Sequence, residues 1–140
     1  MVPVPVPVTS QCLVAAADRY RVPVAALVGV MRAERGRVGM AHANPNGTDD
    51  YGPMQINSIW VPVLARYGIT RAELRYNGCV NVSVGAWILQ RRIAQTGALW
   101  SGIGAYHSAV PGLARRYEIH VYRALRALNE NLVEAVNGAN

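Results

Sequence analysis

Apolar residues recur at steps of three and four along most of this chain, the spacing that places side chains on one face of an α-helix. Before residue 36 the pattern predicts two helices, over residues 11–20 and 23–35. Thr9 or Ser10 suits the cap of the first helix, and Pro23 suits the first turn of the second because its missing N–H is not needed there. The chain therefore becomes helical soon after its first nine residues.

The same spacing returns after residue 57. It predicts a helix capped by Ser58 over residues 58–67, a short helix that begins with a Thr70–Glu73 capping box and ends at Gly78, and further helices over 79–95, 99–106 and 111–129. The last of these has an inward face of Leu113, Tyr117, Val121, Leu125 and Leu128. We expect an all-α domain over residues 10–130, with a flexible Val-Pro tail over 1–9 and a frayed tail over 131–140.

Between residues 38 and 50 the helical spacing gives way to a polar loop. Its Asn44-Pro45-Asn46-Gly47 run is a strong turn signal and predicts a small hairpin or an irregular loop. Glu34 lies just before this loop, on or beside the apolar stripe of the second helix. Desolvation at such a position should raise the pKa of Glu34 and keep it protonated nearer to neutral pH.

Composition narrows the class of protein. A chain of 140 residues with 51% hydrophobic composition can bury its own core, so we expect one domain and a monomer. The formal charge of +6 favours an anionic partner, but the arginines form no stripe with interleaved aromatic residues, which argues against nucleic acid. No run approaches the roughly 18 apolar residues of a membrane helix, and we find no signal peptide in the chain as given.

Cys12 and Cys79 are the two cysteines, too few and too far apart for a zinc site. They form either a disulfide or two buried thiols. A bridge would close a loop of 67 residues (79 − 12), worth at most about 4 kcal/mol in the chain-entropy model, and would indicate an oxidising compartment. We expect no metal ligands, because His42 and His120 are better explained as an ordinary loop residue and a helix residue.

The segment Asp50-Tyr51-Gly52-Pro53-Met54-Gln55-Ile56-Asn57 begins 16 residues after Glu34 (50 − 34) and resembles the active-site segment of the lysozyme-like superfamily. Its Gly-x-Met-Gln-Ile-Asn form, the helix-borne Glu34 and the later Gly104-Ala105-Tyr106-His107 look like soluble lytic transglycosylase (SLT) domains. The most similar subgroup accompanies type IV and type III secretion, conjugation and pilus systems. The resemblance covers roughly residues 12–122.

This resemblance implies a lysozyme-like fold of six or seven helices and a peptidoglycan lytic transglycosylase that needs no cofactor. Glu34 would protonate the oxygen between N-acetylmuramic acid and N-acetylglucosamine, then act as base on the sugar's own 6-hydroxyl to leave a 1,6-anhydro end. Tyr106 is expected to hydrogen-bond and orient Glu34. The residues expected to bind or orient the substrate are Asp50, Met54, Gln55, Asn57, Tyr106 and His107.

The resemblance also implies a disulfide between Cys12 and Cys79, a periplasmic or secreted location, and a role in opening the wall beside a secretion or conjugation apparatus. Three departures from the family pattern bear on activity: Arg35 in place of Ser, Pro53 in place of Leu, and His107-Ser108 in place of Asn-Ala. The charge of Arg35 would lower the pKa of Glu34.

Two alternatives stay open. A lysozyme-type muramidase would use Asp50 as a second carboxylate and release reducing ends, although Asp50 also fits a turn acid that caps backbone N–H groups. A wall-binding assembly factor would keep the fold without turnover. Trp60 and Trp100 fit either a sugar cleft or the core, and Ile56 is expected to pack in the core.

Overall fold

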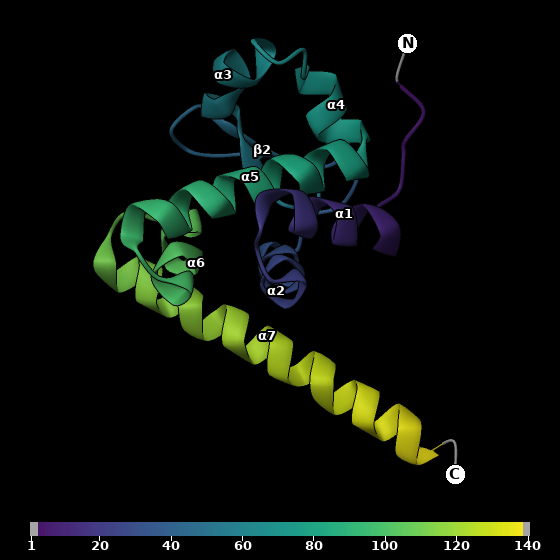
Figure 1. Ribbon diagram of the computed structural model, residues 1–140. Coiled ribbons are helices and arrows are strands. Elements are labelled where there is room, and N and C mark those ends of the chain that lie inside the picture. Colours follow the sequence, from purple (N-terminus) through teal and green to yellow (C-terminus); the bar gives the residue numbers. More distant parts are fainter. Residues whose placement is uncertain (1–2, 139–140) are drawn as a thin grey trace.

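Seven α-helices, one 3₁₀ helix and a small three-stranded sheet make up the computed structural model of the chain (Figure 1). It describes residues 3–138 and, within them, every side chain except those of residues 132–136 and 138. The all-α, lysozyme-like class predicted from the sequence is confirmed. The elements are α1 (Ser10–Tyr20), α2 (Val24–Glu34), β1 (Ala41–Ala43), β2 (Asp49–Tyr51), β3 (Ile56–Asn57), η1 (Ser58–Trp60), α3 (Val61–Ala65), α4 (Arg71–Tyr76), α5 (Gly78–Thr96), α6 (Leu99–His107) and α7 (Pro111–Gly138).

Side chains at the helix ends explain why most helices begin and end where the sequence predicts. Thr9 caps α1, its hydroxyl accepting the Cys12 N–H at 3.1 Å. The Thr70–Glu73 capping box at the start of α4 is confirmed, because each side chain accepts the backbone N–H of the other residue. Gly97 ends α5 in the left-handed conformation, with φ of 81°.

The helix predicted over residues 58–67 is wrong in both its start and its length. The Ser58 hydroxyl accepts the N–H of Asp49 at 3.1 Å and therefore serves the neighbouring strand. Asn57 takes the capping role instead, its side chain accepting the N–H of Ile59 at 3.0 Å. A single 3₁₀ turn follows, and α3 is only five residues long.

The polar loop forms an antiparallel sheet in the order β1-β2-β3. The predicted turn is present between the first two strands, where the Gly47 N–H donates to the Asn44 carbonyl at 3.1 Å. Asp50 stands opposite His42 on one side and opposite Asn57 on the other. The sequence predicts at most a hairpin, and the third strand comes from Ile56 and Asn57, a stretch too short to give a period of its own.

Helix α5 crosses the middle of the domain and contacts α1, α2, α4, α6 and β3 (Figure 1). Ile56 is buried, as predicted. Helix α7 packs on α2 and α6, so the first and last parts of the chain meet at the end of α2. The side chains that are at most 1% exposed include Leu27, Val30, Leu74, Val82, Leu89, Ile103 and Val121.

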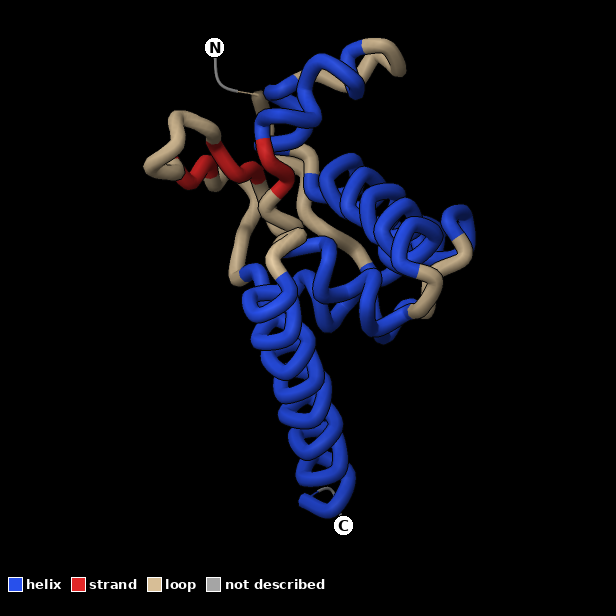
Figure 2. The backbone as a smooth tube through the Cα atoms, turned by 90° about the vertical axis from the view of Figure 1, so that its left-hand side faces the viewer, coloured by secondary structure: helices blue, strands red, loops and turns tan. Residues whose placement is uncertain are grey.

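Helix α7 continues to Gly138, well beyond the predicted end near residue 129, and its second half extends away from the other helices (Figure 2). The reason is local, since no glycine or proline interrupts residues 113–137. The division into a domain over residues 10–130 and a tail over 131–140 stays a prediction, and residues 139–140 lie outside the described part. No helix within residues 3–138 is long and apolar enough to cross a membrane.

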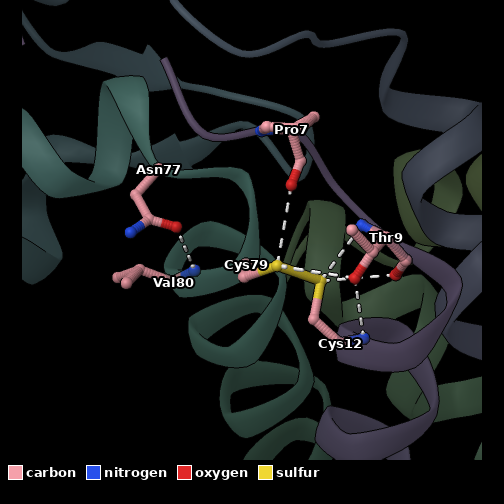
Figure 3. The surroundings of a disulfide bond; sticks show 6 residues. All are labelled: Pro7, Thr9, Cys12, Asn77, Cys79 and Val80. Atoms are coloured by element: carbon pink, nitrogen blue, oxygen red, sulfur yellow. Dashed lines mark hydrogen bonds between the residues drawn. A yellow bond between two sulfur atoms is a disulfide. The ribbon is translucent and has the colours of Figure 1, made fainter. Parts of the chain in front are cut away.

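Cys12 and Cys79 form a disulfide that ties the first turn of α1 to the first turn of α5 (Figure 3). Their Cα atoms are 5.6 Å apart, a usual separation for a disulfide. The Val-Pro segment passes beside this bridge. The Val6 N–H donates to the Tyr76 carbonyl at 2.9 Å and the Gly78 N–H donates to the Val6 carbonyl at 2.7 Å, so this part of the expected flexible tail is held against the domain.

Candidate active site

Glu34 is the last residue of α2, and the backbone turns immediately after it. Arg35 adopts the left-handed conformation, with φ of 56° and ψ of 24°. Gly36 then lies against the Gly52 carbonyl, so closely that a Cβ on Gly36 would be 2.0 Å from that oxygen. Only glycine allows such an approach, which holds the end of α2 against the loop after β2.

The Glu34 carboxyl is half-buried and accepts a hydrogen bond from Tyr117, with 2.5 Å between the hydroxyl oxygen and Oε2. Burial raises the pKa of Glu34 to about 7; the Tyr117 hydrogen bond opposes this increase, and the negative charge of Asp50 adds to it. The increase expected from the helical pattern is confirmed. A carboxyl with this pKa is protonated in about half of the molecules at neutral pH.

The arginines near Glu34 do not neutralise it. Arg126 and Glu130 form the one ion pair among the side chains that the structure describes. The side chain of Arg35 is exposed, and the effects that set the pKa of Glu34 are burial, Tyr117 and Asp50. The expectation that Arg35 lowers this pKa is therefore wrong, because Arg35 follows the turn and lies in solvent.

The tyrosine that contacts Glu34 is Tyr117 of α7. The expected Tyr106–Glu34 hydrogen bond is wrong, because the Tyr106 hydroxyl donates to the Met54 carbonyl at 2.7 Å. Burial, and then the negative charges of Glu34 and Asp50, raise the pKa of Tyr106 well above its usual value, so its hydroxyl stays protonated. The expected role of Tyr106 as a residue that binds or orients the substrate stays a prediction.

His107 lies on the other side of Tyr117. Its imidazole stacks on the Tyr117 ring, with centroids 4.7 Å apart and the planes 4° from parallel. Burial and the adjacent Glu34 raise the pKa of Tyr117 far above its usual value, so Tyr117 is a permanent donor to the carboxyl. His107 thus supports the ring that positions Glu34, while its own exposed side chain faces solvent.

Asp50 comes from the sheet, where it is half-buried in the middle of β2. The Asn57 amide donates to its Oδ1 at 2.9 Å and to the Thr48 hydroxyl at 3.0 Å. Both N–H groups of Asn57 are therefore used within the protein, and its carbonyl oxygen caps η1 by accepting from Ile59. Asn57 acts first as the residue that fixes Asp50, and its expected contact with a sugar stays a prediction.

The loop between β2 and β3 is fixed by Asn81 of α5, which is fully buried. Its amide donates to the carbonyls of Tyr51 at 2.7 Å and Leu74 at 2.8 Å, and its oxygen accepts the Met54 N–H at 2.8 Å. Met54 is fully buried too. The expectation that its side chain lines a sugar subsite is wrong, because this side chain fills the core above Gly85.

Gln55 ends the same loop with an unusual positive φ of 52°. Its Nε2 donates to the Gly52 carbonyl at 2.9 Å, the same oxygen that Gly36 approaches. The amide therefore closes the loop on itself. The predicted contact between Gln55 and substrate stays a prediction.

Two cavities meet at His107. One, of about 650 Å³, is lined on one side by Asn57, Trp60 and Arg92 and on the other by Tyr106. The other, of about 490 Å³, contains Glu34 and is walled by α7. His107 lines both cavities, and Glu34 lines the smaller one.

The two tryptophans considered for sugar binding lie in different places. Trp60 is half-buried at the edge of the larger cavity, where it packs edge-on against Trp87 with centroids 5.4 Å apart. The Arg92 guanidinium lies over its ring at 5.5 Å. Trp100 pairs with Tyr122 on the outer side of α6 and α7 and lines neither cavity.

Comparison with protein families matches residues 11–124 to the transglycosylase SLT domain. The chain belongs to this family. Among curated proteins, the SLT domain described here is 33% identical over 98 residues to the invasion protein IagB of Salmonella typhi, an alignment that covers 67% of this chain and 61% of IagB. It is 30% identical over 100 residues to the protein IpgF of Shigella flexneri, covering 71% of this chain and 66% of IpgF.

A third relative, the peptidoglycan-binding-like protein of Escherichia coli O157:H7, is 34% identical over 87 residues, covering 58% of this chain and 52% of that protein. The alignments thus span less than two thirds of the length of each of these relatives. They place the chain in the SLT family.

The sequence does not predict the roles of two residues in the site, Tyr117 and Asn81. Tyr117 is correctly predicted to face inward from α7, but nothing in the pattern indicates that this face meets the end of α2. Asn81 lies in a run of apolar residues in α5, and an isolated buried asparagine there is a signal that could have been followed, since buried polar groups are hydrogen-bonded. No cluster of metal-ligating side chains occurs in the part of the chain that the structure describes.

Proposed function

We propose that this SLT domain is a peptidoglycan lytic transglycosylase with Glu34 as its catalytic acid and base. The observation that carries the proposal is the Glu34 carboxyl itself: half-buried at a helix end, its pKa raised to about 7, and open to a cavity of about 490 Å³. A general acid works best when its pKa lies near the working pH. The SLT family match supports the same substrate class.

In the proposed reaction, protonated Glu34 gives its proton to the oxygen that leaves from the anomeric carbon of N-acetylmuramic acid. The substrate's own N-acetyl group stabilises the positive charge that develops there. The Glu34 carboxylate then removes the proton of the 6-hydroxyl, whose oxygen bonds to the anomeric carbon and closes the 1,6-anhydro ring. Glu34 ends the cycle protonated, so the balance requires no water and one carboxyl.

Tyr117 has a positioning role in this scheme. Its hydroxyl donates to Glu34 Oε2 and lowers the carboxyl's pKa, which offsets part of the effect of burial. This hydrogen bond favours the carboxylate that must act as base in the second step. Asn57 and His107, which line the larger cavity, are proposed to contact the sugar chain there, and Asn57 does so while holding Asp50. A contact from Gln55, which lines neither cavity, is proposed from its place in the family motif.

A muramidase is the second candidate, and Asp50 is the observation that favours it. The carboxyl of Asp50 is fixed by Asn57, and its charge raises the pKa of Glu34, although less than burial does. In a hydrolase, Asp50 would stabilise or attack the anomeric carbon and water would complete the reaction. Asp50 would then be needed for every turnover.

Mass spectrometry of muropeptides separates the candidates. Purified peptidoglycan is digested with the wild-type protein and with the Glu34→Gln variant, which keeps the shape of the side chain. We expect 1,6-anhydro ends from the wild type and a loss of about a thousandfold or more from the variant. Reducing ends would support the muramidase. If the wild type and Glu34→Gln both bound the glycan and left it intact, the protein would be a wall-binding factor without catalytic activity.

We further propose that the protein acts outside the cytoplasm and opens the wall locally for a secretion or conjugation apparatus. The disulfide suits an oxidising compartment, and the name invasion protein given to the Salmonella relative agrees with such a setting. Thiol labelling of protein taken directly from the source cells, with and without reductant, tests the compartment. Free thiols without reductant would contradict this location.

A further inference from the structure

The α7 face that meets Glu34 carries two side chains able to donate hydrogen bonds, Arg116 and His120, beside the cavity that contains the carboxyl. Leu113, Arg116, Tyr117 and His120 follow one another at steps of three, one and three, so they share one face of the helix, and all four line the cavity that contains Glu34. Tyr117 is buried and points at the carboxyl. Its three neighbours are exposed and face the solvent-filled part of the cavity.

Arg116 has no acidic partner in the part of the chain described by the structure, where the one ion pair joins Arg126 and Glu130. Its guanidinium donates no hydrogen bond to another described side chain either. Leu113, expected to face the core, is 44% exposed beside it. The cavity wall therefore combines an unpaired planar cation, an imidazole and an apolar side chain.

The opposite face of α7 shows that this arrangement is not a general property of a basic helix. Arg115 stands next to Arg116 in the sequence but lines a separate cavity of about 360 Å³ together with Trp100, Glu118 and Tyr122. One arginine thus faces the catalytic candidate, and its neighbour faces an aromatic patch that also holds a carboxylate. The chain itself provides a matched control for the charge of Arg116.

We propose that Arg116 and His120 form a subsite for a free carboxylate of the peptide stem attached to the glycan strand. This inference rests on the proposed function, because it concerns the same substrate at the same cavity. The guanidinium fork matches a carboxylate with two parallel hydrogen bonds, and His120, one turn further on, supplies a further N–H. Leu113 gives the carbon chain of the stem an apolar contact.

A stem carboxylate suits this place better than an isolated anion. The cavity contains the group that would act on the glycosidic bond, and it shares His107 with the larger cavity. A strand lying across both cavities would carry its substituents beside Glu34. The subsite would make the enzyme prefer strands whose stems carry free carboxylates over strands whose stem carboxylates are converted to amides.

The test compares two substrates and four proteins at low salt. One substrate is purified peptidoglycan with free stem carboxylates, and the other is the same peptidoglycan after carbodiimide-coupled ammonia has converted those carboxylates to amides. The proteins are the wild type, Arg116→Ala, Arg116→Lys and Arg115→Ala, the last of which removes the same charge from the other face. We expect the wild type to prefer the strand with free stem carboxylates and Arg116→Ala to lose about five- to tenfold of that preference in kcat/KM.

Arg115→Ala should keep the wild-type preference, and Arg116→Lys should recover part of it, since lysine keeps the charge without the fork. Equal losses on both substrates in Arg116→Ala, or an equal change in Arg115→Ala, would overturn the subsite. The proposed function is judged separately, because it fails if the wild type cleaves neither substrate or leaves reducing ends, and neither result depends on Arg116. Thermal unfolding of all variants checks that the fold is retained.

Discussion

The two carboxylates of the site are held in opposite ways. Glu34 stands at the end of a helix and receives one hydrogen bond, from the Tyr117 hydroxyl, in surroundings that raise its pKa to about 7. Asp50 stands within a strand and is fixed by the Asn57 amide, which is itself fixed by Thr48 and η1. The helix side thus adjusts the protonation of a group, whereas the sheet side fixes a charge in place.

The largest effect should come from Asn81, which holds the loop joining these two sides. Asn81→Ala removes the hydrogen bonds that its side chain makes to three buried backbone groups, the Met54 N–H and the carbonyls of Tyr51 and Leu74. We expect the free energy of unfolding to fall by about 3 to 4 kcal/mol, measured by urea denaturation. Asn77→Ala, which removes the cap of α5, is the control and should cost about 1 kcal/mol.

If Asn81→Ala and Asn77→Ala lowered the free energy of unfolding equally, the hydrogen bonds of Asn81 would not be what holds the loop between β2 and β3.

The next effect concerns the charge of Glu34 in the folded protein. A carboxyl whose pKa rises from 4.5 to about 7 on folding binds more protons in the folded state within that window, so stability falls as the pH rises from 4.5 to 7. At pH 8, Glu34→Gln should therefore be more stable than the wild type by about 2 to 3 kcal/mol. At pH 4 the two proteins should be nearly equal.

Thermal unfolding across this pH range measures the difference. If the difference in free energy of unfolding between Glu34→Gln and the wild type were the same at every pH, burial would not raise the pKa of Glu34. The contrast with Asp50 would then disappear.

Tyr117→Phe removes the one hydrogen bond that the Glu34 carboxyl receives. Without the hydroxyl, the effect that lowers the pKa of Glu34 is gone, so the pKa rises and the alkaline limb of the kcat/KM profile moves to higher pH. We expect kcat to fall about tenfold at the optimum, because a hydrogen bond to the charged carboxyl is lost. Tyr106→Phe, which loses a bond to a loop carbonyl, should leave the alkaline limb in place.

The smallest effect should come from Asp50→Asn. It removes a charge that raises the pKa of Glu34, so the alkaline limb should move to lower pH, opposite to Tyr117→Phe. For a transglycosylase we expect kcat to fall less than about threefold, since one carboxyl completes the reaction. A fall of a hundredfold or more would transfer the chemistry to Asp50 and support the muramidase.

Much of the fold follows from local sequence signals. The helices with clear caps, such as α1 after Thr9 and α4 after Thr70, begin where predicted because a single side chain determines each start. Ser58 failed as a cap because its hydroxyl serves β2, a partner that is distant in sequence and invisible to a local pattern. The predicted end of α7 near residue 129 is wrong for a local reason. Residues that favour helix formation continue to residue 137, and no glycine or proline interrupts them.

The candidate site was predictable only in part. Glu34 and the elevation of its pKa follow from the apolar stripe of α2. Which tyrosine contacts Glu34 depends on how α7 packs on α2. The residues around Tyr106 and Tyr117 in the sequence do not indicate which of the two it is. The motif predicts that Met54 lines the cleft. Its side chain is buried instead, because Gly85 in α5 has no side chain and leaves room for it.

The contact between Gly36 and the Gly52 carbonyl has a consequence for how this fold can be redesigned. Position 36 is closed to any side chain, since a Cβ there would overlap the loop, whereas Arg35 on one side and Arg37 on the other are exposed. Directed evolution toward other wall polymers should therefore leave Gly36 unchanged and accumulate substitutions at its neighbours. A library that randomises residues 35–37 would return glycine at the centre and diversity at both flanks.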